Sequence, residues 1–135
     1  MIEKYTPSDL EKVYEIEKLS FSNPWSENQF TEIEDKLYLA KEKGKILGFI
    51  AIDKILDEAH ILHMAVRSES RRQGIGKKLI KFALKLPAKK WFLEVRAGNI
   101  GAQKLYESFG FKTISRRKKY YQDNDEDALI MELVV

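Results

Sequence analysis

The 135-residue sequence contains no cysteine, only two histidines and no long apolar run. Without cysteine it can form no disulfide, no thiolate-ligated metal site and no cysteine acyl-enzyme. The apolar runs stay short of the roughly 20 residues that a membrane-spanning helix needs. The first residues also lack the apolar segment and the cleavage site of a signal peptide. We therefore expect one cytoplasmic domain, residues 1–135, that makes no contact with a membrane.

The two histidines, His60 and His63, lie in an apolar run that has the length of a strand. They are three residues apart, and because side chains alternate between the faces of a strand, they should point to opposite faces. No cysteine or third histidine could complete a ligand set around either of them. We expect no metal.

Excess charge is also small, because 24 basic residues face 21 acidic ones and leave a net charge of +3. The basic residues instead cluster locally, at Arg71–Arg72, Lys77–Lys78 and Arg116–Lys119. Such patches suit a small anionic ligand better than a nucleic-acid duplex. A non-enzymatic alternative remains, in which Arg116–Lys119 together with Tyr120 and Tyr121 bind RNA or the ribosome through charge and stacking.

Apolar spacing predicts strands mixed with helices. Helices are expected after Thr6-Pro7, after the capping box that begins at Ser26, after the glycines of the RRQGIG stretch and after Asn99, with Pro87 ending the third of them. Strands are expected at residues 1–5, 38–42, 46–53, 60–66, 91–97, 113–122 and 128–135. Hairpins at both ends and strand–helix units between them favour an α/β sandwich around a mixed sheet.

The stretch RRQGIG, residues 71–76, lies where a strand should pass into a helix. Gly74 and Gly76 allow close approach to the backbone, and the free amides at a helix start attract an anion. The stretch is no dinucleotide fingerprint, because Leu79 stands where that motif needs glycine, and it also fails the Walker A pattern. The remaining pattern, R-x-x-G-x-G, fits an anion-binding loop or a tight turn with solvated basic residues.

Three polar residues further along could carry chemistry. Glu94 lies inside the apolar run 91–97, where burial would raise its pKa and suit it to act as a base near neutral pH. The alternative is a glutamate that faces an open side of the sheet or pairs with Arg96. Tyr106 could donate a proton to a leaving group or be a core tyrosine with its hydroxyl at the rim. Asn99 could be only a helix cap.

Taken in order, R-x-x-G-x-G after an apolar strand, then LEVRAGN and QKLYESFGF, resemble the GNAT superfamily of acetyl-CoA-dependent N-acetyltransferases. More narrowly, NPWSENQF, LDEAHILHMAV and RRKKYYQDNDEDALIM resemble the RimI branch, whose members acetylate the N-terminal alanine of a small-subunit ribosomal protein. The likeness runs nearly end to end. It implies a GNAT-type three-layer α/β fold, with a mixed central sheet of about seven strands flanked by about four helices.

The resemblance also implies acetyl-CoA as co-substrate. Its pyrophosphate would lie against the R-x-x-G-x-G loop, and its pantetheine arm would pair with the preceding strand. The residues so assigned are Met64, Ala65, Val66, Arg71, Arg72, Gln73, Gly74, Ile75, Gly76, Lys77, Asn99 and Tyr106.

By the same resemblance, Glu94 matches the family's general base and Tyr106 its general acid. A peptide α-amine has a pKa of about 7.7–8.0, against about 10.4 for lysine, so a carboxylate working through water can deprotonate it. The amine would attack the thioester directly in a ternary complex, and Tyr106 would protonate or hydrogen-bond the departing thiolate. Trp25, Tyr120 and Tyr121 would line the peptide groove.

The implied partners are coenzyme A and a protein N-terminus, in the narrowest form that of a ribosomal protein. We expect a monomer or weak dimer with no direct function on nucleic acid. The enzymatic alternative is a GNAT that acts on a small-molecule amine or on a lysine side chain, because one scaffold supports many acceptors. Two departures from the branch pattern, His63 for asparagine and Gly98 for serine, bear on the acceptor rather than on the reaction.

Overall fold

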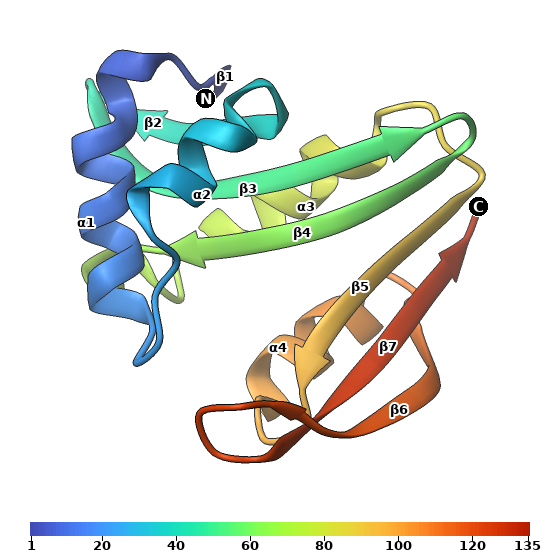
Figure 1. Ribbon diagram of the computed structural model, residues 1–135. Coiled ribbons are helices and arrows are strands. Elements are labelled where there is room, and N and C mark those ends of the chain that lie inside the picture. The colour runs from blue at the N-terminus through green and yellow to red at the C-terminus, as the bar shows by residue number, and fades with distance from the viewer. The chain divides into compact units, whose positions relative to one another are not determined.

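The computed structural model describes residues 1–135 and divides into two compact units. The N-terminal unit comprises Met1–Ile52 and His63–Leu86, and the C-terminal unit comprises Asp53–Leu62 and Pro87–Val135. The elements of both units are labelled in Figure 1. None of the helices, the longest of which has 11 residues, combines the length and the apolarity of a membrane-spanning segment.

Seven strands form a mixed sheet in the order β1-β2-β3-β4-β5-β7-β6. The strands are β1 (Ile2–Lys4), β2 (Leu37–Glu42), β3 (Lys45–Ile55), β4 (Glu58–Val66), β5 (Lys90–Arg96), β6 (Lys112–Tyr121) and β7 (Glu126–Val134). The helices are α1 (Leu10–Ser20), α2 (Glu27–Glu32), α3 (Ile75–Leu84) and α4 (Ile100–Glu107). Strands β4 and β5 run parallel, whereas β5 and β6 each run antiparallel to β7. The predicted α/β fold with about seven strands and four helices is confirmed.

Helices cover both faces of the sheet in the N-terminal unit (Figure 1). The side chains of β2 alternate between these two faces. Leu37 and Leu39 belong to the core cluster that contains residues of α1 and α2. Tyr38 points the other way, and its ring packs 4.9 Å from that of Phe82 on α3. This sandwich of helix, sheet and helix is the predicted three-layer arrangement.

Two helix ends differ from the prediction. Thr6 and Asp9 cap each other around a separate 3-10 turn, Pro7–Asp9, so α1 begins only at Leu10. Helix α3 ends at Leu84, before Pro87, because the amides of Lys85 and Leu86 bond carbonyls three residues back, Phe82 O and Ala83 O, in a tighter last turn. The capping box at Ser26 is confirmed, since Ser26 Oγ accepts from Gln29 N–H at 3.3 Å and Gln29 Oε1 accepts from Ser26 N–H at 2.8 Å.

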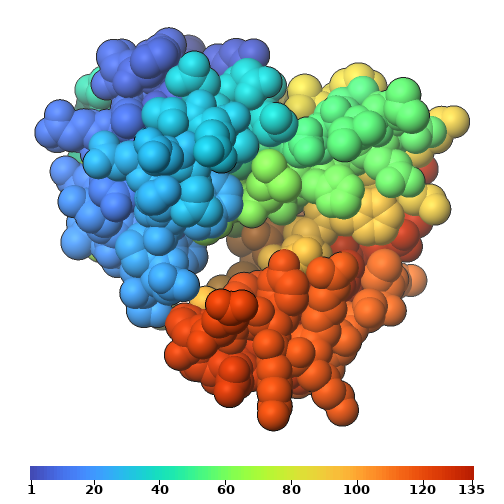
Figure 2. Space-filling model, in the orientation of Figure 1, coloured from blue at the N-terminus to red at the C-terminus, as the bar shows by residue number.

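In the C-terminal unit, β5 buries alternate side chains, Trp91, Leu93 and Val95. The edge strand β6 has nine exposed residues out of ten, and its side chains appear in orange at the surface in Figure 2. The unit therefore has a buried central strand and an open outer edge.

Candidate active site

The R-x-x-G-x-G loop leads directly into α3. Gly74 is the N-cap of this helix, with a φ of 79° in the left-handed region that favours glycine, and a Cβ there would meet nothing within 4 Å. The first backbone bond of the helix runs from Lys78 N–H to Gly74 O at 3.0 Å. The amides of Ile75, Gly76 and Lys77 precede it and have no acceptor inside the helix. The loop thus offers a cluster of amides to an anion.

The basic side chains of this loop divide into two kinds. Arg71 braces the loop, because its Nε donates to Val66 O at 3.1 Å. Gln73 likewise donates to Glu69 O at 3.3 Å. Arg72 and Lys77 are exposed, which leaves their charges available to a pyrophosphate. The amides, the open space at Gly74 and these charges fit the anionic part of acetyl-CoA.

Met64, Ala65 and Val66 form the end of β4, and the neighbouring strand holds their backbone closely. A Cβ at Gly48 on β3 would lie 2.7 Å from Ala65 O and 3.3 Å from Val66 Cα, so only glycine fits there. Arg67 N–H then donates to Leu47 O at 2.7 Å. The segment assigned to the pantetheine arm is therefore fixed from the β3 side.

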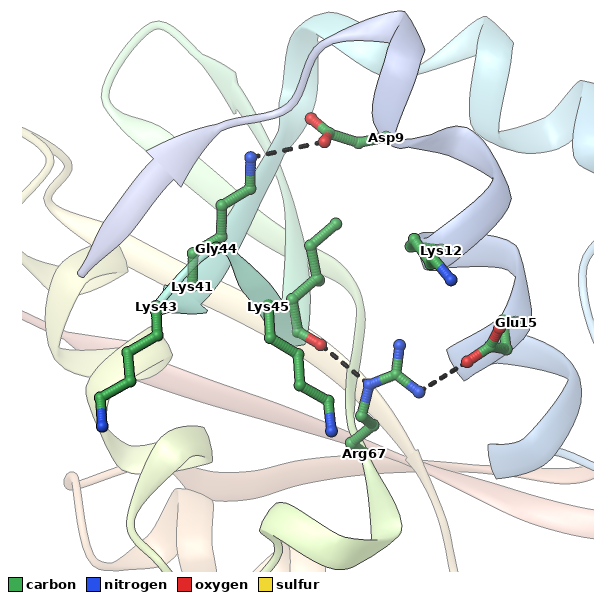
Figure 3. A pocket seen from close by; sticks show the side chains of 9 residues that line it. Asp9, Lys12, Glu15, Lys41, Lys43, Gly44, Lys45 and Arg67 are labelled. Atoms are coloured by element: carbon green, nitrogen blue, oxygen red, sulfur yellow. Dashed lines mark hydrogen bonds and ion pairs between the residues drawn. The ribbon is translucent and has the colours of Figure 1, made fainter.

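Sequence reasoning missed Arg67, whose side chain anchors the same strand end. It is buried, its Nε donates to Ile46 O at 2.9 Å, and its Nη1 donates to Glu15 Oε1 on α1 at 2.7 Å (Figure 3). An arginine after an apolar strand looks solvated in the sequence, and its partners are 21 and 52 residues away. No local signal could have identified it.

Arg67 also borders a surface pocket of about 550 Å³, shown in Figure 3. The pocket is lined by Asp9, Lys12, Glu15, Lys41, Lys43, Gly44, Lys45, Ile46 and Arg67. Opposite charges pair across it, such as Lys41 with Asp9 at 3.4 Å. None of the predicted site residues lines it, so the pocket is separate from the candidate site.

Trp25, predicted to line the peptide groove, lies in the segment between α1 and α2. Its ring stacks on His63 with centroids 4.2 Å apart and an interplanar angle of 10°. Its backbone N–H donates to Glu17 Oε2 at 2.9 Å. Glu17 is another residue that sequence reasoning missed.

The C-terminal unit holds Glu94, and of the alternatives that the sequence left open, the buried carboxylate is wrong. The side chain of Glu94 is 39% exposed, because β5 buries the odd-numbered residues and turns Glu94 to the other face. The alternative of an open sheet face is confirmed, but the partner is Arg117 at 4.0 Å rather than Arg96. Glu94 therefore lies on the side of β5 that is open to solvent.

The two predicted groove tyrosines gather around this carboxylate. Glu94 raises the pKa of Tyr120 above its usual value, first through hydrogen bonding and then through its charge. Burial raises the pKa of Tyr121, with the charge of Glu94 as the second cause. The two tyrosine rings meet edge to face with centroids 5.2 Å apart. The structure thus brings Glu94, Tyr120 and Tyr121 together.

Arg96 pairs with carboxylates other than Glu94. It bonds Asp123 at 3.1 Å and Glu126 at 3.3 Å, and its guanidinium lies 3.9 Å from the centroid of the Tyr121 ring. Glu126 in turn accepts from Gly98 N–H at 2.6 Å. This network fixes the turn between β5 and α4.

Asn99 caps α4, as predicted, since its Oδ1 accepts from Ala102 N–H at 3.1 Å. Tyr106 lies on the inner side of this helix, is 7% exposed and packs against Phe111 at 5.8 Å between ring centroids. Burial raises the pKa of Tyr106 to about 12. At neutral pH its hydroxyl therefore carries a proton that it can donate.

No group of three or more His, Cys, Asp or Glu side chains gathers around a possible metal position. The expectation that the reaction needs no metal stays a prediction.

The three-layer arrangement of helix, sheet and helix and the glycine loop before α3 are typical of an acyltransferase fold. The sequence model of the Acetyltransferase (GNAT) family matches residues 10–111, and the chain belongs to this family of acetyl-CoA-dependent N-acetyltransferases. The predicted enzyme class and RimI-like resemblance are confirmed by the relatives.

One such relative comes from Bacillus subtilis (strain 168) and is 40% identical, over 94% of this chain and 90% of that protein. The [ribosomal protein bS18]-alanine N-acetyltransferase of Escherichia coli (strain K12) is 36% identical, over 95% of this chain and 93% of that protein. The crystal structure of the ribosomal-protein-S18-alanine N-acetyltransferase from Escherichia coli is 34% identical and superposes with a TM-score of 0.93, covering 100% of this chain and 93% of that one. The fold and the family are thus the same over nearly the full length.

Proposed function

We propose that this chain transfers the acetyl group of acetyl-CoA to the N-terminal α-amine of a protein, and that its acceptor is the N-terminal alanine of ribosomal protein bS18. The observation that carries the proposal is the 36% identity to the Escherichia coli bS18-alanine N-acetyltransferase over 95% of this chain. The gathering of Glu94, Tyr120 and Tyr121 supports a peptide acceptor.

Acetyl-CoA supplies the acetyl group when bound, and the loop and β4 would hold it. The amides of Ile75, Gly76 and Lys77, with the charges of Arg72 and Lys77, bind the pyrophosphate. The backbone of residues 64–66 pairs with the pantetheine arm, and Asn99 orders that arm. Arg71 and Gln73 contribute by bracing the loop, as their bonds to Val66 O and Glu69 O indicate.

Glu94 acts as the general base through water. Its exposed carboxylate is open to solvent, and an α-amine with a pKa of about 7.7–8.0 gives up its proton readily near neutral pH. The amine nitrogen then bonds to the thioester carbonyl carbon, and the carbon–sulfur bond breaks as the thiolate leaves.

Tyr106 assists the departing sulfur. A thiol of the cysteine type has a pKa of about 8.5, whereas burial raises the pKa of Tyr106 to about 12. Full proton transfer from Tyr106 to such a thiolate would be uphill by about 3.5 pKa units, roughly 5 kcal/mol. Of the two predicted actions, donation of a hydrogen bond is therefore favoured over complete proton transfer.

Trp25, Tyr120 and Tyr121 line the acceptor groove in this proposal. We further infer that residues 1–135 work as one catalytic domain, since the family model takes in stretches of both units. A cytoplasmic location follows from a ribosomal acceptor. We propose a monomer or weak dimer that uses no metal.

The proposal is tested with purified bS18 and acetyl-CoA, by locating the added acetyl group with tandem mass spectrometry. We expect one acetyl group on the α-amine of the N-terminal alanine. Acetyl groups found only on lysines would support the alternative of a lysine acceptor. An unmodified bS18 alongside an acetylated small amine would support the small-molecule alternative.

A further inference from the structure

Glu17 is a carboxylate inside the core of the N-terminal unit. It lies on α1 and is 0% exposed, although the same helix offers its outer face to solvent at Glu11. Burying a charge is unfavourable unless partners satisfy it, and an apolar side chain of similar size would fill the space at lower cost. The mechanism proposed above makes no use of Glu17.

The two oxygens of Glu17 bond two different segments. Oε1 accepts from His63 Nε2–H on β4 at 2.7 Å, and Oε2 accepts from Trp25 N–H at 2.9 Å. Trp25 belongs to residues 22–25, which form neither helix nor strand. Glu17 thus ties an irregular segment to α1 and β4 at once.

His63 holds the same tryptophan by a second contact. Its imidazole stacks on the Trp25 indole at 4.2 Å, and Phe21 packs against the imidazole at 4.8 Å. Phe49 and Phe30 lie further out, at 5.8 and 6.4 Å between centroids. The ring of Trp25 is thereby fixed by the imidazole, and its backbone by the carboxylate that orients that imidazole.

We propose that Glu17 and His63 are positioning residues that preset Trp25 and, through it, the acceptor groove. Neither residue touches the reacting atoms in this scheme. The inference rests on the proposed function, because the role of Trp25 in acceptor binding belongs to it. It assigns His63, a departure from the branch pattern, to acceptor recognition rather than to a metal site or to proton transfer.

The substitutions Glu17→Gln, His63→Asn and His63→Ala separate the contacts. Glutamine presents a donor where Glu17 accepts, so one of the two bonds is lost, and asparagine keeps a donor but removes the stacked ring. Glu11→Gln, on the exposed face of the same helix, is the matched control. All are made with Trp91→Phe, which leaves Trp25 as the remaining indole and costs no hydrogen bond, since Trp91 Nε1 has no partner.

Steady-state kinetics with an Ala-starting peptide and quenching of Trp25 fluorescence by acrylamide are then measured. For Glu17→Gln we expect the KM for peptide to rise about tenfold or more, as for loss of a hydrogen bond to a charged group. The KM for acetyl-CoA should change less than about twofold, and Trp25 should become more quenchable. His63→Asn should lie between the Trp91→Phe parent and His63→Ala in both measurements. Glu11→Gln should match the Trp91→Phe parent.

Equal increases in both KM values, or unchanged quenching of Trp25, would overturn the proposal, since a general packing role predicts them. If Glu17→Gln does not fold, the two His63 variants decide the question. A wild type that acetylates no peptide would defeat the proposed function instead. In that case the quenching of Trp25 would still test whether Glu17 and His63 fix it.

Discussion

The two units differ in whether their charged side chains are buried or exposed. The three buried polar or charged residues, Glu17, Arg67 and Ser70, all lie in the N-terminal unit. In the C-terminal unit the charged groups form pairs at the surface, such as Arg116 with Asp127 at 2.6 Å and Arg117 with Glu94 at 4.0 Å. The difference matches the proposed tasks. A loop that binds an anion through backbone amides needs a fixed main chain, whereas proton removal through water needs an open carboxylate.

The largest expected effect is on the stability of the N-terminal unit. Arg67→Ala leaves the buried Ile46 carbonyl and Glu15 without their partner, so we expect the free energy of unfolding to fall by about 3 kcal/mol or more. Arg116→Ala in the C-terminal unit is the control. Its pair with Asp127 is half exposed, and its loss should cost less than about 1 kcal/mol. Urea unfolding followed by circular dichroism measures both, and equal losses would remove the contrast between the units.

Next in size is the loss of the base. Glu94→Gln should lower kcat/KM for an Ala-starting peptide by about a hundredfold, the range for removal of a general base. Acetyl-CoA affinity should stay within about twofold, because Glu94 is proposed to act on the acceptor. The measurement is thiol release under steady-state conditions, with the exposed strand residue Glu58→Gln as control. An unchanged rate would refute the proposed role.

A comparable effect is expected in the stability of the fold at alkaline pH. Burial raises the pKa of Tyr106 from 10.0 to about 12 in the folded chain. Because the unfolded chain loses this proton first, the stabilisation is complete below pH 10 and is lost as the pH rises toward 12. This rise in pKa corresponds to a free energy of roughly 3 kcal/mol.

Comparing the wild type with Tyr106→Phe isolates this contribution from those of the other tyrosines. The free energy of unfolding of the wild type should fall more steeply between pH 10 and pH 12 than that of the variant. Parallel curves would mean that Tyr106 is not buried as the fold requires.

The smallest expected effect comes from valine substitutions at Gly74 and Gly44, which distinguish loss of anion binding from backbone strain alone. Gly74 and Gly44 share a φ of 79° and open space where a Cβ would stand, so valine at either position should cost a similar amount of stability. Only Gly74→Val should weaken acetyl-CoA binding, by about tenfold, because the strain shifts the amides that follow it. Isothermal titration calorimetry with acetyl-CoA checks this. Weaker binding in both variants, or in neither, would count against the loop assignment.

Local sequence signals predicted much of the fold. The capping box at Ser26, the cap at Asn99 and the glycine turn into α3 each depend on residues a few positions apart, and all were found. The ends of helices were predicted less well, since Pro87 marks a point that α3 cannot pass but does not determine its last residue.

The misses have two physical causes. The burial of Glu94 was left open, although Trp91, Leu93 and Val95 already occupy the buried face of β5 and leave Glu94 on the other one. Strand periodicity applied to the whole run would have decided between the two alternatives. The bond between Glu17 and His63 spans 46 residues, and such pairing depends on tertiary packing that no local pattern contains.

The identity of the acceptor separates a bS18-type N-acetyltransferase from the alternative acetyltransferases, and one measurement tests it directly. Initial rates of acetylation are compared by mass spectrometry for an Ala-starting peptide copied from bS18, its Ser- and Met-starting variants, and a peptide with a blocked N-terminus and a free lysine. We predict acetylation of the Ala-starting α-amine at the highest rate and none of the blocked peptide. Faster acetylation of the blocked peptide's lysine, or acetylation of none of the four, would contradict the account.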